Sequence, residues 1–205
     1  MKSVNLEAAK KRLEAVQKID TFFLFMPGNQ LFPSRNFKDH EGNVHSHKVQ
    51  KRRYKNRQVE SQMTKYAPIL SLCKDKNVNK IVIVPCYLRN IHRPCSATYE
   101  YCTSRNLREA FPLWYSKKII NLAMRKVGKL IAAEGIRHET ISLKKFEYIC
   151  LGEEMKNLSN KHMILKILGE DDVHLSPGPQ RLLGQYLSHI IRRERAAATR
   201  PMGEC

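Results

Sequence analysis

The stretch Thr21-Phe22-Phe23-Leu24-Phe25-Met26 decides the fold class of this 205-residue chain. It is an apolar run without polar alternation, which is typical of a strand buried on both faces. The run ends at Pro27-Gly28-Asn29-Gln30, residues that favour a turn. A second run of this kind is Lys80-Ile81-Val82-Ile83-Val84-Pro85. The sequence therefore predicts buried strands at 21–26 and 80–85.

Helical patterns alternate with these strands. Apolar residues recur with a period near 3.6 in four segments, and a third short strand is expected between the last two of them. We expect helices at about 6–18, 59–73, 116–134 and 179–192, a kink at Pro68, the third strand at 139–143, and an irregular or helical connection over 144–168. The alternation predicts an α/β fold: a parallel sheet with helices on both faces, joined by right-handed crossovers.

Length and cysteine content suggest a single intracellular domain. The chain is long enough for one α/β domain, has no run of about 18 apolar residues, and shows no apolar signal core at its start. Its six cysteines form no Cys-x-x-Cys pair, and the spacing of Cys86, His92, Cys95 and Cys102 fits no common zinc site. His40, His45 and His47 are a second candidate for a metal, but only Asp39 and Glu41 lie near them as further ligands. We expect reduced thiols, no metal, no membrane association, and a cytoplasmic or nuclear location.

The charge of the chain favours polyanionic partners. Lysine and arginine number 37 against 19 acidic residues, which gives a formal charge of +18. Such a charge favours RNA or DNA, and the alternative is a basic surface that binds non-specifically. The polar segment 33–57 is expected to be a long loop or insertion, and the tail Arg192 to Arg200 is also basic. The phosphate-binding candidates within the segment are Lys51, Arg52, Arg53, Lys55 and Arg57.

A candidate acid–base couple lies in Gly169-Glu170-Asp171-Asp172-Val173-His174-Leu175-Ser176-Pro177, just before the last predicted helix. A carboxylate three residues before a histidine can fix the tautomer of the imidazole, so that the other ring nitrogen acts as a general base. We expect Ser176 to cap the helix and Pro177 to stand in its first turn. The alternative is a solvated aspartate and a histidine that meet by chance in a loop.

A candidate oxyanion hole follows the first strand. Ligands of open parallel sheets gather beyond the carboxyl ends of the strands, where Asn29 could donate from its amide and Gly28 allows close backbone approach. The second strand likewise opens into a segment that contains Arg89. The alternative for Pro27-Gly28-Asn29 is a plain turn.

Taken together, these pieces resemble the SGNH (GDSL-type) hydrolase family over residues 6–192. The resemblance rests on a strand ending in Gly28-Asn29, a later strand ending in Pro85 with Arg89 nearby, and Asp171-x-x-His174 followed by Leu-Ser-Pro and a terminal helix. It implies a three-layer flavodoxin-like domain over residues 1–192. Within and after this domain, composition predicts the basic insertion at 33–57 and a basic, disordered tail at 193–205. The resemblance further implies ester hydrolysis without a metal or organic cofactor, with His174 as base, Asp171 as its orienting partner, and Asn29 and Gly28 in the oxyanion hole.

The departures from the family concern the nucleophile. No Gly-Asp-Ser occurs in the sequence, and Pro27 and Gln30 stand where the family has glycine and aspartate. The resemblance thus covers the carboxyl-terminal part of such a domain, incomplete at its amino end and inactive as an esterase. The alternative function is nucleic-acid binding, because similar esterase-like domains occur in retroelement proteins.

The same departure has a structural consequence. In the family the missing first strand pairs beside the strand that is here 21–26, so its absence leaves this strand at an edge with unpaired backbone groups. We therefore expect self-association, a partner that supplies a strand, or a truncated product that folds poorly.

Overall fold

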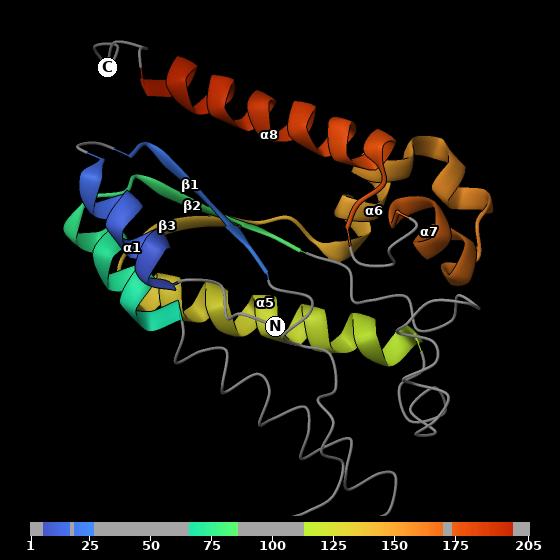
Figure 1. Ribbon diagram of the computed structural model, residues 1–205, viewed down its shortest axis with the longest axis horizontal. Helices are drawn as coiled ribbons and strands as arrows, with labels where there is room; N and C mark the ends of the chain where they lie inside the picture. Colours follow the sequence, from blue (N-terminus) through green and yellow to red (C-terminus); the bar gives the residue numbers. More distant parts are fainter. Residues whose placement is uncertain (1–5, 17–18, 27–65, 86–112, 170–173, 199–205) are drawn as a thin grey trace, which may run out of the picture.

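The structure is a computed structural model that describes residues 6–16, 19–26, 66–85, 113–169 and 174–198. Its sheet has three parallel strands, in the order β1 (Thr21–Phe25), β2 (Lys80–Val84) and β3 (Arg137–Thr140). Thr21 lies opposite Lys80, which in turn lies opposite Arg137. The predicted α/β class with a parallel sheet is therefore confirmed (Figure 1).

Helices cover both faces of this sheet, as Figure 1 shows. α5 lies along one face and α8 along the other, while α6 and α7 lie beyond the carboxyl ends of the strands. The helical segments are α1 (Leu6–Ala15), an unlabelled helix at 66–75, α5 (Leu113–Ala133), α6 (Leu143–Leu151), the 3-10 helix η2 (Gly152–Asn157), α7 (Asn160–Ile167) and α8 (Pro177–Ala198).

Side chains of the central strand alternate between the two helical layers. A Cβ added at Gly128 of α5 would lie 3.1 Å from Nε2 of His138 and 3.7 Å from Ile83, so these side chains face α5. Lys80 and Glu139, by contrast, bond to residues of α8. All five residues of β2 are buried, which makes this strand the centre of the core.

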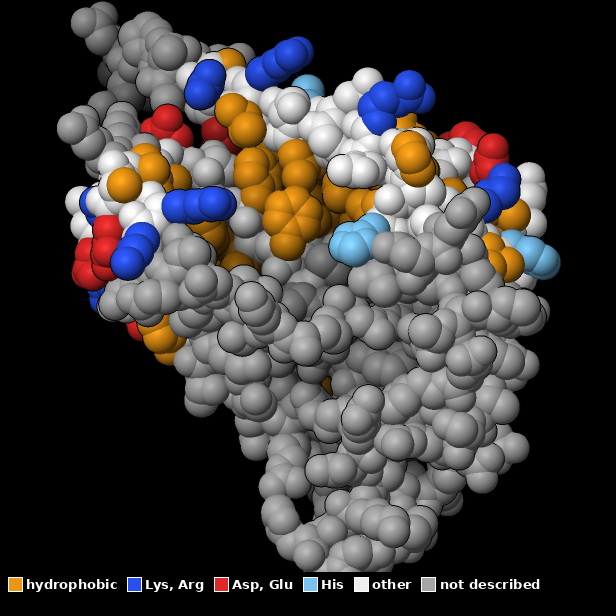
Figure 2. All heavy atoms as spheres, viewed as in Figure 1, with side chains coloured by type: hydrophobic (Ala, Val, Ile, Leu, Met, Phe, Trp, Pro, Cys, Tyr) orange, Lys and Arg blue, Asp and Glu red, His pale blue; other side chains and the backbone are white. Residues whose placement is uncertain are grey.

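The first strand is less buried than its sequence predicts. Leu24 is 5% exposed, but Phe25 is 48% exposed, so the expectation of burial on both faces is wrong at the end of β1. In the described part of the chain β1 pairs with β2 along one edge. Figure 2 shows hydrophobic side chains gathered on the face between α8 and the sheet.

The bounds of β3, the cap of α8 and the end of α8 differ from the prediction. The third strand spans 137–140 rather than 139–143, because the hydroxyl of Ser142 accepts a hydrogen bond from the Lys145 amide and starts α6 at Leu143. The hydroxyl of Ser176, expected to cap α8, instead donates to the carbonyl of Lys166 at 2.8 Å. α8 begins at Pro177 and continues to Ala198, so residues 193–198 are helical.

The other helices are close to their predicted positions. α1 ends at Ala15 rather than Lys18, α5 begins at Leu113 rather than Ser116, and the helix expected to end at Cys73 continues to Asp75. The expected start of the helix at 66–75 lies outside the described residues, so the kink at Pro68 stays a prediction. The connection over 144–168 consists of α6, η2 and α7.

Candidate functional site

His174 lies on the turn that joins α7 to α8, of which residues 168–169 and 174–176 are described. Leu168 and Leu175 form an antiparallel bridge that closes the turn. The Gly169 amide donates to the His174 carbonyl at 2.8 Å, and the Ser176 amide donates to the Ile167 carbonyl at 2.8 Å. Leu168 is buried, whereas the His174 side chain is exposed. The backbone of residues 174–176 is therefore bound to that of residues 167–169, beside the buried Leu168, while the imidazole reaches solvent.

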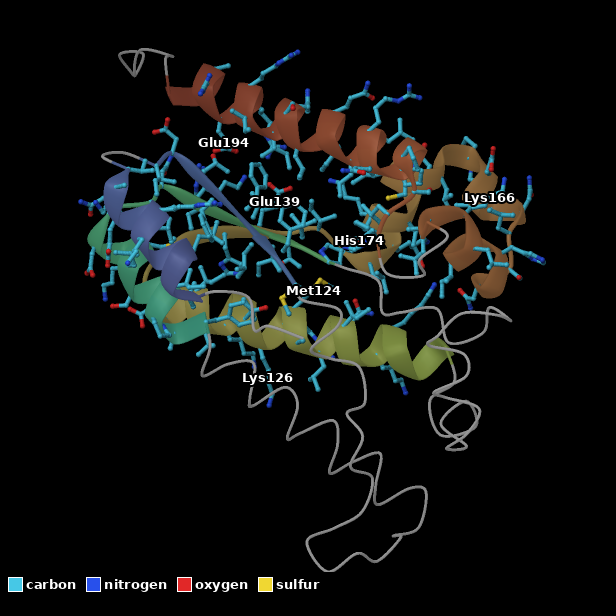
Figure 3. The ribbon with its side chains drawn as sticks, in the orientation of Figure 1. Met124, Lys126, Glu139, Lys166, His174 and Glu194 are labelled. Carbon is cyan, nitrogen blue, oxygen red and sulfur yellow. The ribbon has the colours of Figure 1, made fainter. Side chains whose placement is uncertain are left out.

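The turn is at the end of the molecule where an open parallel sheet binds its ligands. Figure 3 labels His174 beside the carboxyl ends of the strands and next to α6. α8 begins three residues after His174 and packs against α6, which itself follows β3. An exposed imidazole at this position can accept or donate a proton at the surface of the domain.

The remaining residues of the predicted site lie outside the described residues. These are Asp171, Asn29 and Gly28, together with Arg89 and the phosphate-binding candidates Lys51, Arg52, Arg53, Lys55 and Arg57. The structure thus places His174 alone among them. The meeting of Asn29 with the Asp171–His174 couple stays a prediction.

At the opposite end of the sheet, the structure contains an ion-pair network that the sequence pattern does not predict. Lys80, which is 6% exposed, donates to Glu139 of β3 at 2.7 Å and to Glu194 of α8 at 2.9 Å. Arg193 adds a contact to Glu139 at 2.9 Å, and Arg137 pairs with Glu194. A lysine at the start of an apolar strand was the available signal, since a buried lysine needs a partner.

The carboxylates of this network are held ionised. The hydrogen bond from Lys80 lowers the pKa of Glu194, and although burial opposes this, the charges of Lys80 and Arg137 reinforce it. Burial raises the pKa of Glu139, but Lys80 and Arg193 outweigh it and leave this pKa below its usual value. Both carboxylates accept hydrogen bonds that join α8 to the strands. The network therefore holds α8 on the sheet and does not transfer protons.

A buried carboxylate, Glu147, joins three helices. Glu147 of α6 is 5% exposed and forms an ion pair with Lys117 of α5. The same amine donates to the side-chain oxygen of Asn160 in α7 at 2.8 Å. This contact fixes α6 and α7, and with them the start of the turn that carries His174.

The described cysteines are poor nucleophiles. Cys73 and Cys150 are buried free thiols. Burial raises the pKa of Cys73 to about 11, and burial together with the charge of Glu147 raises the pKa of Cys150 to about 12. Because the thiolate is the reactive form, neither thiol is an effective nucleophile at neutral pH.

A polar cavity of about 390 Å³ lies at the amino ends of β2 and β3, opposite the end that carries His174. Its lining includes Asn77, Arg137 and the exposed pair of Lys74 and Glu134, whose charged atoms are 3.1 Å apart. The charges of this pair neutralise one another.

No family model, curated protein or solved structure matches this chain. Across the described ranges, no three His, Cys, Asp or Glu side chains gather where they could hold a metal ion. In that same part of the chain, no helix is long and apolar enough to span a bilayer. The functional argument therefore depends on the residues described above and on the sequence pattern.

Proposed function

We propose that this chain is an SGNH-hydrolase-like domain that carries the acid–base couple of a serine esterase without its nucleophile. The observation that carries the proposal is the exposed His174 on a closed turn, directly before α8 and beside the carboxyl ends of the strands (Figure 3). The order β1-β2-β3 supports it, because it agrees with the last three strands of a flavodoxin-like sheet.

In this proposal each predicted residue has a defined role. His174 accepts a proton from an attacking hydroxyl, and Asp171 orients the imidazole and stabilises its charged form. Asn29 and Gly28 follow the carboxyl end of β1 and donate hydrogen bonds to the oxyanion. No Gly-Asp-Ser occurs among the 205 residues, so the chain alone has nothing for His174 to deprotonate. We therefore expect it to be inert toward esters.

The couple can be tested without activity, by NMR of the imidazole nitrogens. If Asp171 accepts from one ring nitrogen, His174 is held in one tautomer, and Asp171→Asn shifts it to the other. His189, exposed on α8, is the internal control and should not change. Identical His174 spectra in the parent and in Asp171→Asn would contradict the couple.

The expected inactivity is tested separately with p-nitrophenyl acetate. We expect the full chain and His174→Ala to give the same rate as buffer. Turnover by the parent that His174→Ala abolishes would overturn the inactivity and would point to another nucleophile.

Nucleic-acid binding is a second candidate function, favoured by the charge of α8. Arg192 and Arg195 lie on the exposed side of this helix, while its one carboxylate, Glu194, bonds to Lys80 and Arg137. We expect labelled single-stranded RNA to bind with an affinity that falls steeply with salt. Replacing Lys51, Arg52, Arg53, Lys55 and Arg57 by glutamine should lower the slope of log K against log salt. Binding that does not depend on salt would contradict this function.

A further inference from the structure

The outer side of α5 is a row of cations without acidic neighbours on the same helix. α5 contains five lysine and arginine residues and no aspartate or glutamate. Lys118, Arg125 and Lys129 are exposed, and Val127, which a helix of 3.6 residues per turn directs the opposite way, is buried. Figure 3 shows Lys126 pointing away from the sheet and Met124 pointing toward it. The three exposed residues therefore form one stripe along the helix.

Within the part of the chain that the structure describes, three cations of this helix have no carboxylate partner, unlike other lysines and arginines. Ion pairs between described residues involve Lys74, Lys80, Lys117, Arg137, Lys156, Lys166 and Arg193. Arg125, Lys126 and Lys129, in contrast, form no ion pair with a carboxylate of the described residues. Arg125 and Lys129 are four residues apart and repel each other, which weakens a helix. A bound polyanion would relieve this repulsion.

We infer that the outer face of α5 binds the phosphate backbone of a nucleic acid. Lys118 and Lys129 are eleven residues apart, or roughly 17 Å along the helix axis. Over that distance one strand of a DNA duplex presents about five phosphates. A stripe of cations matches such a row of charges, and contacts to phosphates alone would not depend on base sequence.

A lipid surface fits this helix less well. A helix that lies on a membrane inserts its apolar side between the lipids. The apolar side of α5 is part of the core, since Ile120, Val127 and Ile131 are each at most 2% exposed. The stripe therefore offers charge without an apolar anchor, which suits a phosphate backbone in water.

The inference rests on the nucleic-acid-binding function proposed above, and the experiment separates the two. The full chain is titrated into a labelled single-stranded RNA of mixed sequence at several salt concentrations. The test variant is Arg125→Gln/Lys126→Gln/Lys129→Gln. The matched control is Lys144→Gln/Lys145→Gln/Arg181→Gln, which removes three exposed cations from α6 and α8 and so changes the net charge equally. Glutamine favours helices about as well as lysine, so both variants should keep their circular dichroism.

We expect the α5 variant to lower the salt slope by about 2 and to raise the Kd at 0.1 M salt on the order of 100-fold, with little change in the control. An equal loss in both variants would overturn the inference, because net charge alone would then govern binding. Retained binding by the α5 variant, with loss on replacing the lysines and arginines of 51–57, would overturn the α5 surface and leave nucleic-acid binding intact. A parent that does not bind RNA would overturn both proposals. A parent that binds phosphatidylserine vesicles more tightly than RNA would overturn the partner class.

Discussion

Lys80 shows how one buried charge can organise the contact between a sheet and a helix. Its side chain reaches Glu139 on the neighbouring strand and Glu194 on α8, and each carboxylate has a further arginine partner. A buried charge that keeps all its partners is tolerated, whereas removal of one partner leaves the others less well compensated. Lys80 is therefore the residue whose loss should cost the most within this network.

We predict that Lys80→Met lowers the free energy of unfolding by about 3 kcal/mol, because two carboxylates lose their shared partner. Urea denaturation followed by circular dichroism measures the change. Lys74→Met is the matched control, since the Lys74 side chain is 59% exposed in its pair with Glu134, and such exposed pairs contribute at most about 1 kcal/mol. Equal effects of the two substitutions would contradict a special role for Lys80.

The same network predicts a dependence of stability on pH. The pKa of Glu194 in the folded chain is lowered from an ordinary value of 4.5, mainly by the hydrogen bond from Lys80. Its stabilisation is complete above the unfolded value and is lost as the pH falls through the folded value. We expect Glu194→Gln to be less stable than the parent at pH 7, with a difference that shrinks below about pH 4.5. Urea midpoints between pH 7 and pH 3 measure this, with Glu134→Gln as the exposed control. A constant difference would argue against it.

Among the elements, α8 contains a glycine that the fold does not require. A Cβ at Gly184 would meet no atom within 4 Å. Gly184→Ala should therefore stabilise the protein by up to about 1 kcal/mol, the difference in helix propensity between the two residues. Gly128→Ala in α5 should gain less, because its Cβ would lie 3.1 Å from the His138 ring. Thermal unfolding of the two variants compares them, and equal melting temperatures would be the contrary result.

The sequence predicts the presence of helices and strands better than the residues at which they end. β1 and β2 could be located within a residue because apolar runs are a local signal. The end of β3 could not, because Ile141 and Leu143 continue an apolar alternation while Ser142 begins a helix. α8 was predicted to stop near Arg192 because its apolar period stops at Ile191. Its last turns are held by Glu194, an electrostatic contact between residues distant in the sequence.

For the candidate site, the sequence could identify which residue types are present but not which of them lie close together in space. His174 was placed correctly just before a helix, because its neighbours have local helix and turn signals. The buried Lys80 network was missed because its four other members are 57 or more residues away along the chain. Patterns within a window cannot show which distant charges share one environment.

For the whole molecule, the edge of the sheet at β1 predicts self-association. The described part of β1 pairs with β2 along one edge, Phe25 is 48% exposed, and hydrophobic side chains gather between α8 and the sheet (Figure 2). An apolar edge strand can pair with a second copy or with a strand from a partner. We expect the apparent mass in sedimentation equilibrium to rise with concentration, and Phe25→Lys to reduce this rise. A monodisperse monomer at all concentrations would contradict the prediction.

α8 reaches from one end of the sheet to the other. Its beginning adjoins the turn of His174, and Glu194, seventeen residues after Pro177 or roughly 26 Å along the axis, is bound to Lys80. Such a helix moves as a rigid body. If protonation of Glu194 or a competing cation broke the ion pair with Lys80, α8 would tilt as a whole, and the His174 imidazole would be displaced. The orientation of the His174 side chain would then depend on the Lys80–Glu194 ion pair at the other end of the domain.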